Sequence, residues 1–214
     1  MTMQNIRLTL AYDGSDFSGW QVQPERRTVQ GVLEQAIAEL TGESIRVLSA
    51  GRTDAGVHAL GQVASFRTQS TIPAEKWRPA LQSKLPPDVV ILDSAAVEDD
   101  FHATFAARSK RYRYLIRERL FDDPFLRRYV WRIGTPLDVD AMRTAAAALV
   151  GTHDFRCFET EYPNKATSVR TVLDVQLVRF DHWPGWFGAA IPHATQAPSA
   201  GEFIAFEIEA DGFL

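Results

Sequence analysis

SAGRTDAGVHALGQV, residues 49–63, is the stretch that says most about the fold of this 214-residue chain. Its two glycines, Gly51 and Gly56, allow a tight loop and a close approach of backbone to a ligand. Between them lie one cation, Arg52, and one carboxylate, Asp54. Short strands predicted at 45–48 and 63–66 flank the loop. The stretch therefore predicts a rigidly held loop that presents two charged groups.

Three kinds of chemistry are open to this loop. An aspartate in water is ionised at neutral pH, so Asp54 can serve as a nucleophile or base without further activation. The structural alternative is an Arg52–Asp54 ion pair that fixes a turn, a common surface feature of small energetic effect. The third is a metal site in which Asp13, Asp16 and His58 join Asp54, although the spacing supplies no compact set of ligands.

Outward from the loop, strands and helices alternate. Apolar residues two apart predict a strand at 6–12, a short apolar run after two prolines predicts a buried strand at 89–92, and further strands are predicted at 110–116, 168–180 and 203–210. Helical spacing predicts helices at 29–40, with Thr28 as N-cap and Gly42 as the stop, at 77–85 and at 139–149. The pattern repeats in two halves, 1–107 and 108–214, with no Gly- or Pro-rich linker between them. We expect an α+β fold whose halves share one mainly antiparallel sheet.

Composition narrows the class of protein. With 45% hydrophobic and 23% charged residues, the chain has the make-up of a folded soluble protein. No apolar run approaches the ~20 residues that span a bilayer, and no hydrophobic signal core is present, so we expect a cytoplasmic protein without a membrane partner. The single cysteine, Cys157, excludes an intrachain disulfide and is expected to be a small buried residue. Without a P-loop or dinucleotide glycine pattern, no cofactor is expected.

Charge is unevenly distributed along the chain. The net charge is −4, yet residues 101–132 hold nine Arg and Lys against three acidic residues. Nucleic-acid backbones respond to local potential, so this basic segment is compatible with RNA as a partner, and the more common alternative is a plain solvated strand face with scattered arginines. Within it, a strand would place Tyr112 and Tyr114 on one face and Arg111 and Arg113 on the other. The tyrosines could stack on exposed bases or belong to the core.

Taken together, the segments resemble the tRNA pseudouridine synthase A family. The matching stretches, in order along the chain, are AYDGSDFSGWQVQP (11–24), TVQGVLEQAI (28–37), SAGRTDAGVHALGQV (49–63), FHATFAARSKRYRYLI (101–116) and LVGTHDF (149–155). GRTDAGVHA is a long and specific motif. The resemblance implies the pseudouridine synthase fold, with two similar halves around a central, mainly antiparallel sheet flanked by helices.

The resemblance also implies a reaction and roles for individual residues. The family isomerises uridine to pseudouridine in the anticodon stem-loop of tRNA, at positions 38 to 40, without a cofactor and as a homodimer. Asp54 is then the catalytic nucleophile, and Arg52 helps to extrude the target nucleotide. Tyr112 stacks on the uracil. Arg111 and Arg113 contact phosphates, which makes binding salt-dependent.

The chain departs from the family at its C-terminus. Family members continue past Leu214 with a segment resembling Phe-x-x-x-Met-Val-Arg, whose basic residue pairs with the catalytic aspartate. We therefore expect a truncated chain with an incomplete second half, and a loop at 181–201 of unassigned role. The main alternative function is a catalytically inactive tRNA- or RNA-binding protein. A metal-dependent phosphohydrolase is the remaining enzyme class.

Overall fold

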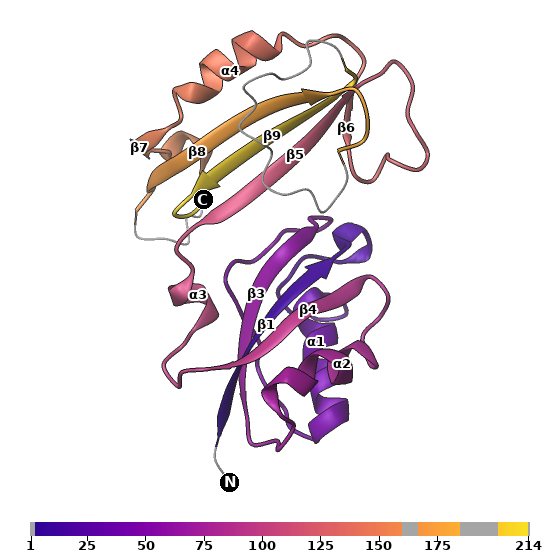
Figure 1. Ribbon diagram of the computed structural model, residues 1–214, viewed down its shortest axis with the longest axis vertical. Coiled ribbons are helices and arrows are strands. Elements are labelled where there is room, and N and C mark those ends of the chain that lie inside the picture. Colours follow the sequence, from indigo (N-terminus) through magenta and orange to yellow (C-terminus); the bar gives the residue numbers. More distant parts are fainter. Residues whose placement is uncertain (1–2, 160–166, 185–200, 214) are drawn as a thin grey trace. The chain divides into compact units, whose positions relative to one another are not determined.

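The protein forms two compact units, Met1–Ala107 and Arg108–Leu214. The computed structural model describes residues 3–159, 167–184 and 201–213. Each unit has its own β-sheet with helices packed against it (Figure 1). None of the helices in these described ranges is long and apolar enough to cross a membrane.

The sheet of the first unit has the strand order β2-β3-β1-β4, and all of its neighbouring strands pair antiparallel. Its strands are β1 (Gln4–Tyr12), β2 (Leu48–Ser49), β3 (Ala59–Thr68) and β4 (Val89–Val97). The helices are α1 (Val29–Thr41), α2 (Trp77–Gln82) and the short α3 (Ala103–Ala106). Two single helical turns, η1 (Gly14–Asp16) and η2 (Ala74–Lys76), complete it.

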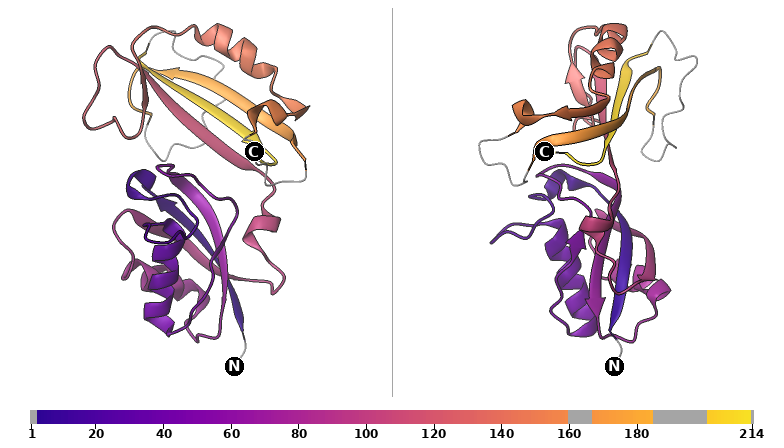
Figure 2. Two further views of the ribbon diagram at one scale, coloured as in Figure 1. Left: turned by 180° about the vertical axis from the view of Figure 1, so that it is seen from behind. Right: turned by 90° about the vertical axis from the view of Figure 1, so that its left-hand side faces the viewer.

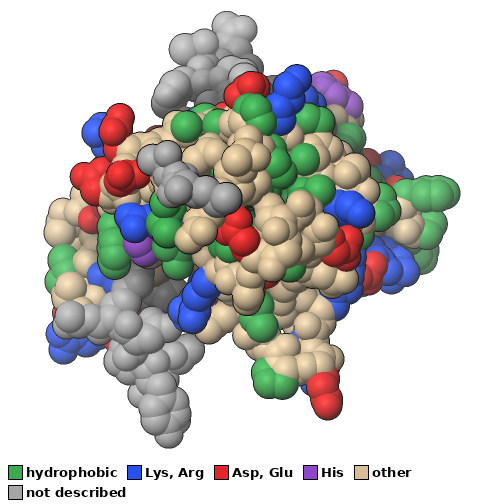
Figure 3. Space-filling view, turned by 90° about the horizontal axis from the view of Figure 1, so that it is seen from below, with side chains coloured by type: hydrophobic (Ala, Val, Ile, Leu, Met, Phe, Trp, Pro, Cys, Tyr) green, Lys and Arg blue, Asp and Glu red, His purple; other side chains and the backbone are tan. Residues whose placement is uncertain are grey.

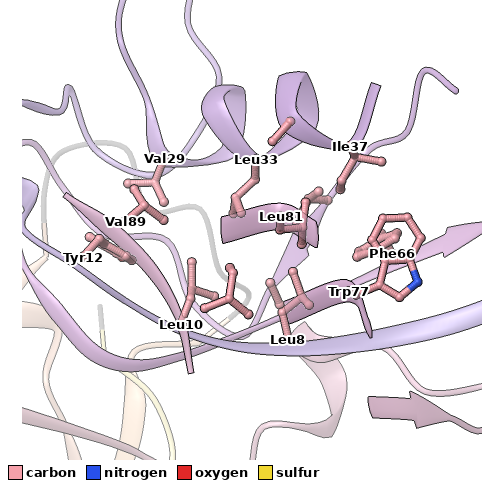
Figure 4. Close-up of a cluster of buried hydrophobic side chains, with 14 of the residues drawn as sticks. Leu8, Leu10, Tyr12, Val29, Leu33, Ile37, Phe66, Trp77, Leu81 and Val89 are labelled. Atoms are coloured by element: carbon pink, nitrogen blue, oxygen red, sulfur yellow. The ribbon is translucent and has the colours of Figure 1, made fainter. Parts of the chain in front are cut away.

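The core of this unit lies between the sheet and the helices α1 and α2. Ile6, Leu8 and Leu10 of β1 are two apart and therefore share a face, and all three are 0% exposed. They meet residues from both helices, among them Leu33, Ile37, Trp77 and Leu81 (Figure 4). Burial of each large apolar side chain contributes about 1.5–3 kcal/mol. The alternation of apolar residues in β1 thus builds the core of the first unit.

Helix α1 begins and ends where its sequence predicts. Thr28 is extended and its Oγ1 accepts a hydrogen bond from the Gly31 N–H at 3.2 Å, which satisfies a donor at the open helix end. Gly42 has φ 75°, the left-handed conformation that favours glycine after a helix. The predicted helix at 29–40 and both of its caps are confirmed.

The sheet of the second unit has the order β6-β5-β9-β8-β7. Its strands are β5 (Lys110–Glu118), β6 (Trp131–Ile133), β7 (Gly151–Asp154), β8 (Val169–Phe180) and β9 (Phe203–Ala210). Among these described strands, β5 and β6 pair parallel, and the other neighbouring strands pair antiparallel. Helix α4 (Val139–Ala147) lies along one face, as two views show (Figures 1 and 2), and the turn η3 (Arg156–Phe158) follows β7.

The α+β class and the mainly antiparallel pairing are confirmed. The described strands form two sheets, one in each unit, where the sequence predicts one sheet shared by both halves. The reason is that each half completes its own hydrogen-bonded ladders: β1 pairs with β3 and β4, whereas β9 pairs with β5 and β8.

Two local predictions were wrong. Residues 45–47 are not a strand, because the N–H of Val47 donates to the Glu34 side chain of α1 at 2.9 Å instead of to a strand partner. Cys157 is exposed. It lies on η3, where the neighbouring Phe158 is 70% exposed as well, so this turn belongs to the surface. Of the predicted loop 181–201, residues 185–200 lie outside the described residues.

Candidate functional site

The Asp54 loop runs from β2 to β3 and turns sharply at its centre. The Val57 N–H donates to the Asp54 carbonyl at 3.2 Å, and Gly56, third in this four-residue turn, has φ 79°. A positive φ at that position is what a type II turn requires, and glycine adopts it at little cost. Asp54 is exposed. The loop motif therefore places Asp54 at the start of a tight turn that faces solvent.

The N-terminal limb of the turn is held at Thr53. The Thr53 carbonyl accepts the Trp20 N–H at 2.9 Å, and its Oγ1 lies 2.8 Å from the Tyr12 hydroxyl. Gly19 permits this approach: it has φ 88°, and a Cβ there would lie 2.7 Å from the Thr53 carbonyl oxygen. The stretch after β1 thus holds the residue next to Asp54 in place. In the sequence, this stretch stood out only as part of a long segment that matches the family.

The C-terminal limb is held at Val57 and His58. A Cβ on Gly14 would lie 2.0 Å from the Val57 carbonyl oxygen, so the two backbones are in direct contact. His58 Nδ1 lies 3.2 Å from the Gly14 N and 3.1 Å from Asp13 Oδ1. Both limbs of the turn are therefore anchored to residues 12–20.

Arg52 and Asp54 do not form the ion pair that was the structural alternative. Both are exposed, and neither side chain has a hydrogen-bond or ion-pair partner within the ranges 3–159, 167–184 and 201–213. Ordinary surface carboxylates near an arginine tend to pair with it, although weakly. The loop thus presents an uncompensated carboxylate and a nearby cation, both available to a ligand.

No metal centre forms from the predicted acidic and histidine residues. In the part of the chain that the structure describes, no three His, Cys, Asp or Glu side chains come together in a way that could hold a metal ion. Asp13 and His58 instead contact each other at the base of the loop.

Tyr112 lies on β5 of the second unit, opposite Ile208 of β9. Its ring contacts that of Phe213 edge to face, with centroids 4.5 Å apart and planes at 71°. Such aromatic pairs restrict the orientation of both rings. Tyr112 is half-buried, whereas Tyr114 on the same strand is 54% exposed.

Arg111 and Arg113 share a buried acidic partner, Glu207 of β9, which is 1% exposed. Arg113 reaches it through Nε. Arg111 reaches it through Nη1 at 3.0 Å and also pairs with Glu209 and Asp174. Although partial burial opposes it, the hydrogen bonds that Arg111 donates to Glu209 and Glu207 raise the pKa of Arg111. The two arginines therefore lie on one face of the sheet and are held by carboxylates.

Acidic partners neutralise much of the basic segment 101–132. Arg117 pairs with Asp123 and Glu202, Arg119 with Glu202, and Arg132 with Asp122. Within the described residues, the side chains without such a partner include Arg108, Lys110 and Arg127. On the face drawn in Figure 3, too, basic and acidic side chains are interspersed. A count of basic residues in the sequence therefore overstates the positive electrostatic potential of this segment.

Sequence reasoning missed the residues that support the site. Glu207 and Glu209 lie in an otherwise apolar strand, and this alternation was the available signal for charged partners on one face. Their pairing with arginines about 95 positions earlier follows only from the β5–β9 register, in which Arg113 lies opposite Glu207 and Arg111 opposite Glu209. The matching motifs contain Tyr12, Asp13 and His58, but the sequence did not predict the contacts that these residues make.

With this geometry in place, known proteins identify the chain. A family model described as tRNA pseudouridine synthase matches residues 9–106 and 145–214. The chain therefore belongs to the tRNA pseudouridine synthase family and is an enzyme of the isomerase class.

Individual relatives agree with this assignment. Proteins called tRNA pseudouridine synthase A from Thermoanaerobacter sp. strain X514 and Moorella thermoacetica are 42% and 46% identical over 212 and 214 residues, covering 99% of this chain and 79% of each relative. One of the same name from Brevibacillus brevis is 48% identical over 183 residues, covering 85% of this chain and 75% of the relative.

Proposed function

We propose that the protein converts uridine to pseudouridine in the anticodon stem-loop of tRNA, at positions 38 to 40, with Asp54 as the catalytic nucleophile. The observation that carries the proposal is the carboxylate of Asp54: it is exposed, has no partner among the described residues, and lies in a turn anchored on both sides. A nucleophile held in one geometry reacts faster than a mobile one.

The reaction is an isomerisation that needs no electron transfer. The bond between ribose C1′ and uracil N1 breaks, a bond between C1′ and C5 forms, and the proton of C5 is lost while N1 gains one. As a nucleophile, the Asp54 carboxylate adds either to C1′ or to the uracil ring, and it leaves again when the new bond is complete. Both steps conserve the atoms of the substrate.

The other predicted residues have supporting roles. The target nucleotide must leave the helical stack to react, and Arg52, exposed two residues from Asp54, helps to extrude it. Tyr112 stacks on the uracil, with its ring oriented by Phe213. Of the two strand arginines, Arg113 is the better phosphate ligand, because Glu207 occupies its Nε but its Nη groups have no partner among the described residues. The guanidinium of Arg111, in contrast, already donates hydrogen bonds to carboxylates through both Nη groups.

The proposal includes a homodimer that works in the cytoplasm. It is supported by the family membership, and sedimentation equilibrium over a range of concentrations tests the dimer directly. A single monomeric species up to micromolar concentrations would contradict it.

Tritium release tests the reaction itself. tRNA carrying uridine tritiated at C5 should release tritium into water when the protein is added, because C5 loses its proton. A transcript with cytidine at positions 38 to 40 should release none. Binding of tRNA without any release would support the alternative, an inactive tRNA-binding protein. Release in the presence of EDTA separates the isomerase from a metal-dependent phosphohydrolase.

A further inference from the structure

A histidine outside the proposed catalytic set links the Asp54 turn to the turn after β1. His58 Nδ1 faces two groups at similar distance, the Gly14 N at 3.2 Å and Asp13 Oδ1 at 3.1 Å. The side chains of His58 and Asp13 are 23% and 35% exposed. This contact is therefore half-buried in the first unit, at the base of the loop.

One nitrogen cannot serve both partners at once. A neutral ring with its proton on Nε2 accepts the Gly14 N–H, whereas a ring protonated at Nδ1 donates to Asp13. Asp13 also accepts the Ser15 N–H at 2.9 Å, so Gly14 lies inside a formed turn in either case. His58 is consequently tied to the same turn whichever nitrogen carries the proton.

The contact of His58 with the turn after β1 affects Asp54 because only a short, hydrogen-bonded stretch of backbone separates the two residues. His58 follows Val57, whose N–H donates to the Asp54 carbonyl, and the Val57 carbonyl rests against Gly14. A shift of His58 must therefore move the turn that begins at Asp54. Displacements of about 1 Å at a reacting group can cost 100-fold in rate.

We propose that His58 is a positioning residue: its Nδ1 anchors the C-terminal limb of the turn and thereby orients the Asp54 carboxylate for reaction. This inference rests on the proposed function of Asp54. It assigns His58 no contact with the tRNA, so its loss should lower kcat and leave KM nearly unchanged.

Two amide variants form a matched pair for the test. His58→Asn retains a polar atom bonded to Cγ, where Nδ1 is, and can still accept from Gly14 or donate to Asp13. His58→Gln is also a polar amide but carries its polar atoms one bond further out, near the position of Nε2. We expect kcat for tritium release to stay within about threefold of wild type for His58→Asn. For His58→Gln we expect it to fall about 10- to 100-fold, with KM within twofold.

A second readout does not depend on turnover. The Gly14 amide should exchange with solvent slowly in the wild type and in His58→Asn, and about tenfold faster in His58→Gln. Equal kcat values for the two variants, a rise in KM without a fall in kcat, or unchanged Gly14 exchange in His58→Gln would overturn the proposal. If the wild type releases no tritium, the proposed function of Asp54 fails, and the exchange measurement still decides whether His58 holds the turn.

Discussion

The hydroxyl of Tyr12 lies 2.8 Å from Oγ1 of Thr53, the residue immediately before Asp54. Tyr12 is the last residue of β1 and is 4% exposed, as part of the first unit's core. Because the Thr53 carbonyl also accepts the Trp20 N–H, two contacts join this core to the reactive loop. The position of Asp54 is therefore determined by packing that lies beneath it.

Tyr12→Phe should weaken this connection without opening the core. Loss of one hydrogen bond of this kind costs about 0.5–1.5 kcal/mol. We expect kcat for tritium release to fall about three- to tenfold, with little change in the affinity for tRNA. Tyr114→Phe is the matched control, since Tyr114 is 54% exposed, and should behave as wild type. A wild-type kcat in Tyr12→Phe would show that the Tyr12 hydroxyl does not help to position Asp54.

Arg113→Gln should weaken tRNA binding in a salt-dependent way. If the Nη groups of Arg113, which have no partner among the described residues, contact a phosphate, the slope of log affinity against log salt should decrease by about 0.7–0.9. Arg156→Gln removes the same charge from a side chain that is 77% exposed and paired with Asp154, and serves as the control. Filter binding at several salt concentrations measures both. An unchanged slope in Arg113→Gln would mean that Arg113 does not contact the tRNA backbone.

Glu207→Gln should destabilise the second unit. Its carboxylate is buried between Arg111 and Arg113, so the substitution removes the charge that compensates both cations. Because the arginines are partly exposed, we expect a loss of about 1–3 kcal/mol in the free energy of unfolding, less than for a fully buried pair. Urea denaturation compares it with Asp140→Asn, whose side chain is 90% exposed and should change little. Equal stability of the two variants would contradict the prediction.

Stability should also fall in acid, partly through Glu209. The Ser109 hydroxyl and the Arg111 guanidinium hold the pKa of Glu209 below its usual value of 4.5. A lowered pKa in the folded state contributes stability that is present above pH 4.5 and is lost as the pH falls further. The free energy of unfolding should therefore decrease between pH 5 and pH 3, and less steeply in Glu209→Gln. Parallel curves for the two proteins would exclude this contribution.

Much of this structure could be predicted from local patterns in the sequence, whereas the rest depends on contacts between residues far apart in the chain. The two-residue spacing of Ile6, Leu8 and Leu10 predicted β1, since alternation follows directly from strand geometry. Thr28 and Gly42 bounded α1 because capping is a local interaction. The two separate sheets were not predictable in this way, because strand pairing depends on contacts far apart in the chain.

The same distinction applies to the candidate site. The motif around Asp54 pointed to an exposed reactive carboxylate, and the tight turn at Gly56 agrees with its two-glycine pattern. The carboxylates that engage Arg111 and Arg113 come from β9, so the charge of β5 could not be judged from β5 alone. For His58, a metal site was a minority alternative that the spacing did not favour, and its observed contact is with the turn at Asp13.

The central claim is that Asp54 performs the chemistry. The most direct test measures tritium release from tRNA tritiated at uridine C5 for the wild type and Asp54→Asn, with tRNA affinity measured in parallel. Asp100→Asn, which alters another exposed aspartate of the first unit, is the control. We predict release by the wild type and Asp100→Asn, none by Asp54→Asn, and similar affinities for all three. Release by Asp54→Asn at the wild-type rate would contradict the claim.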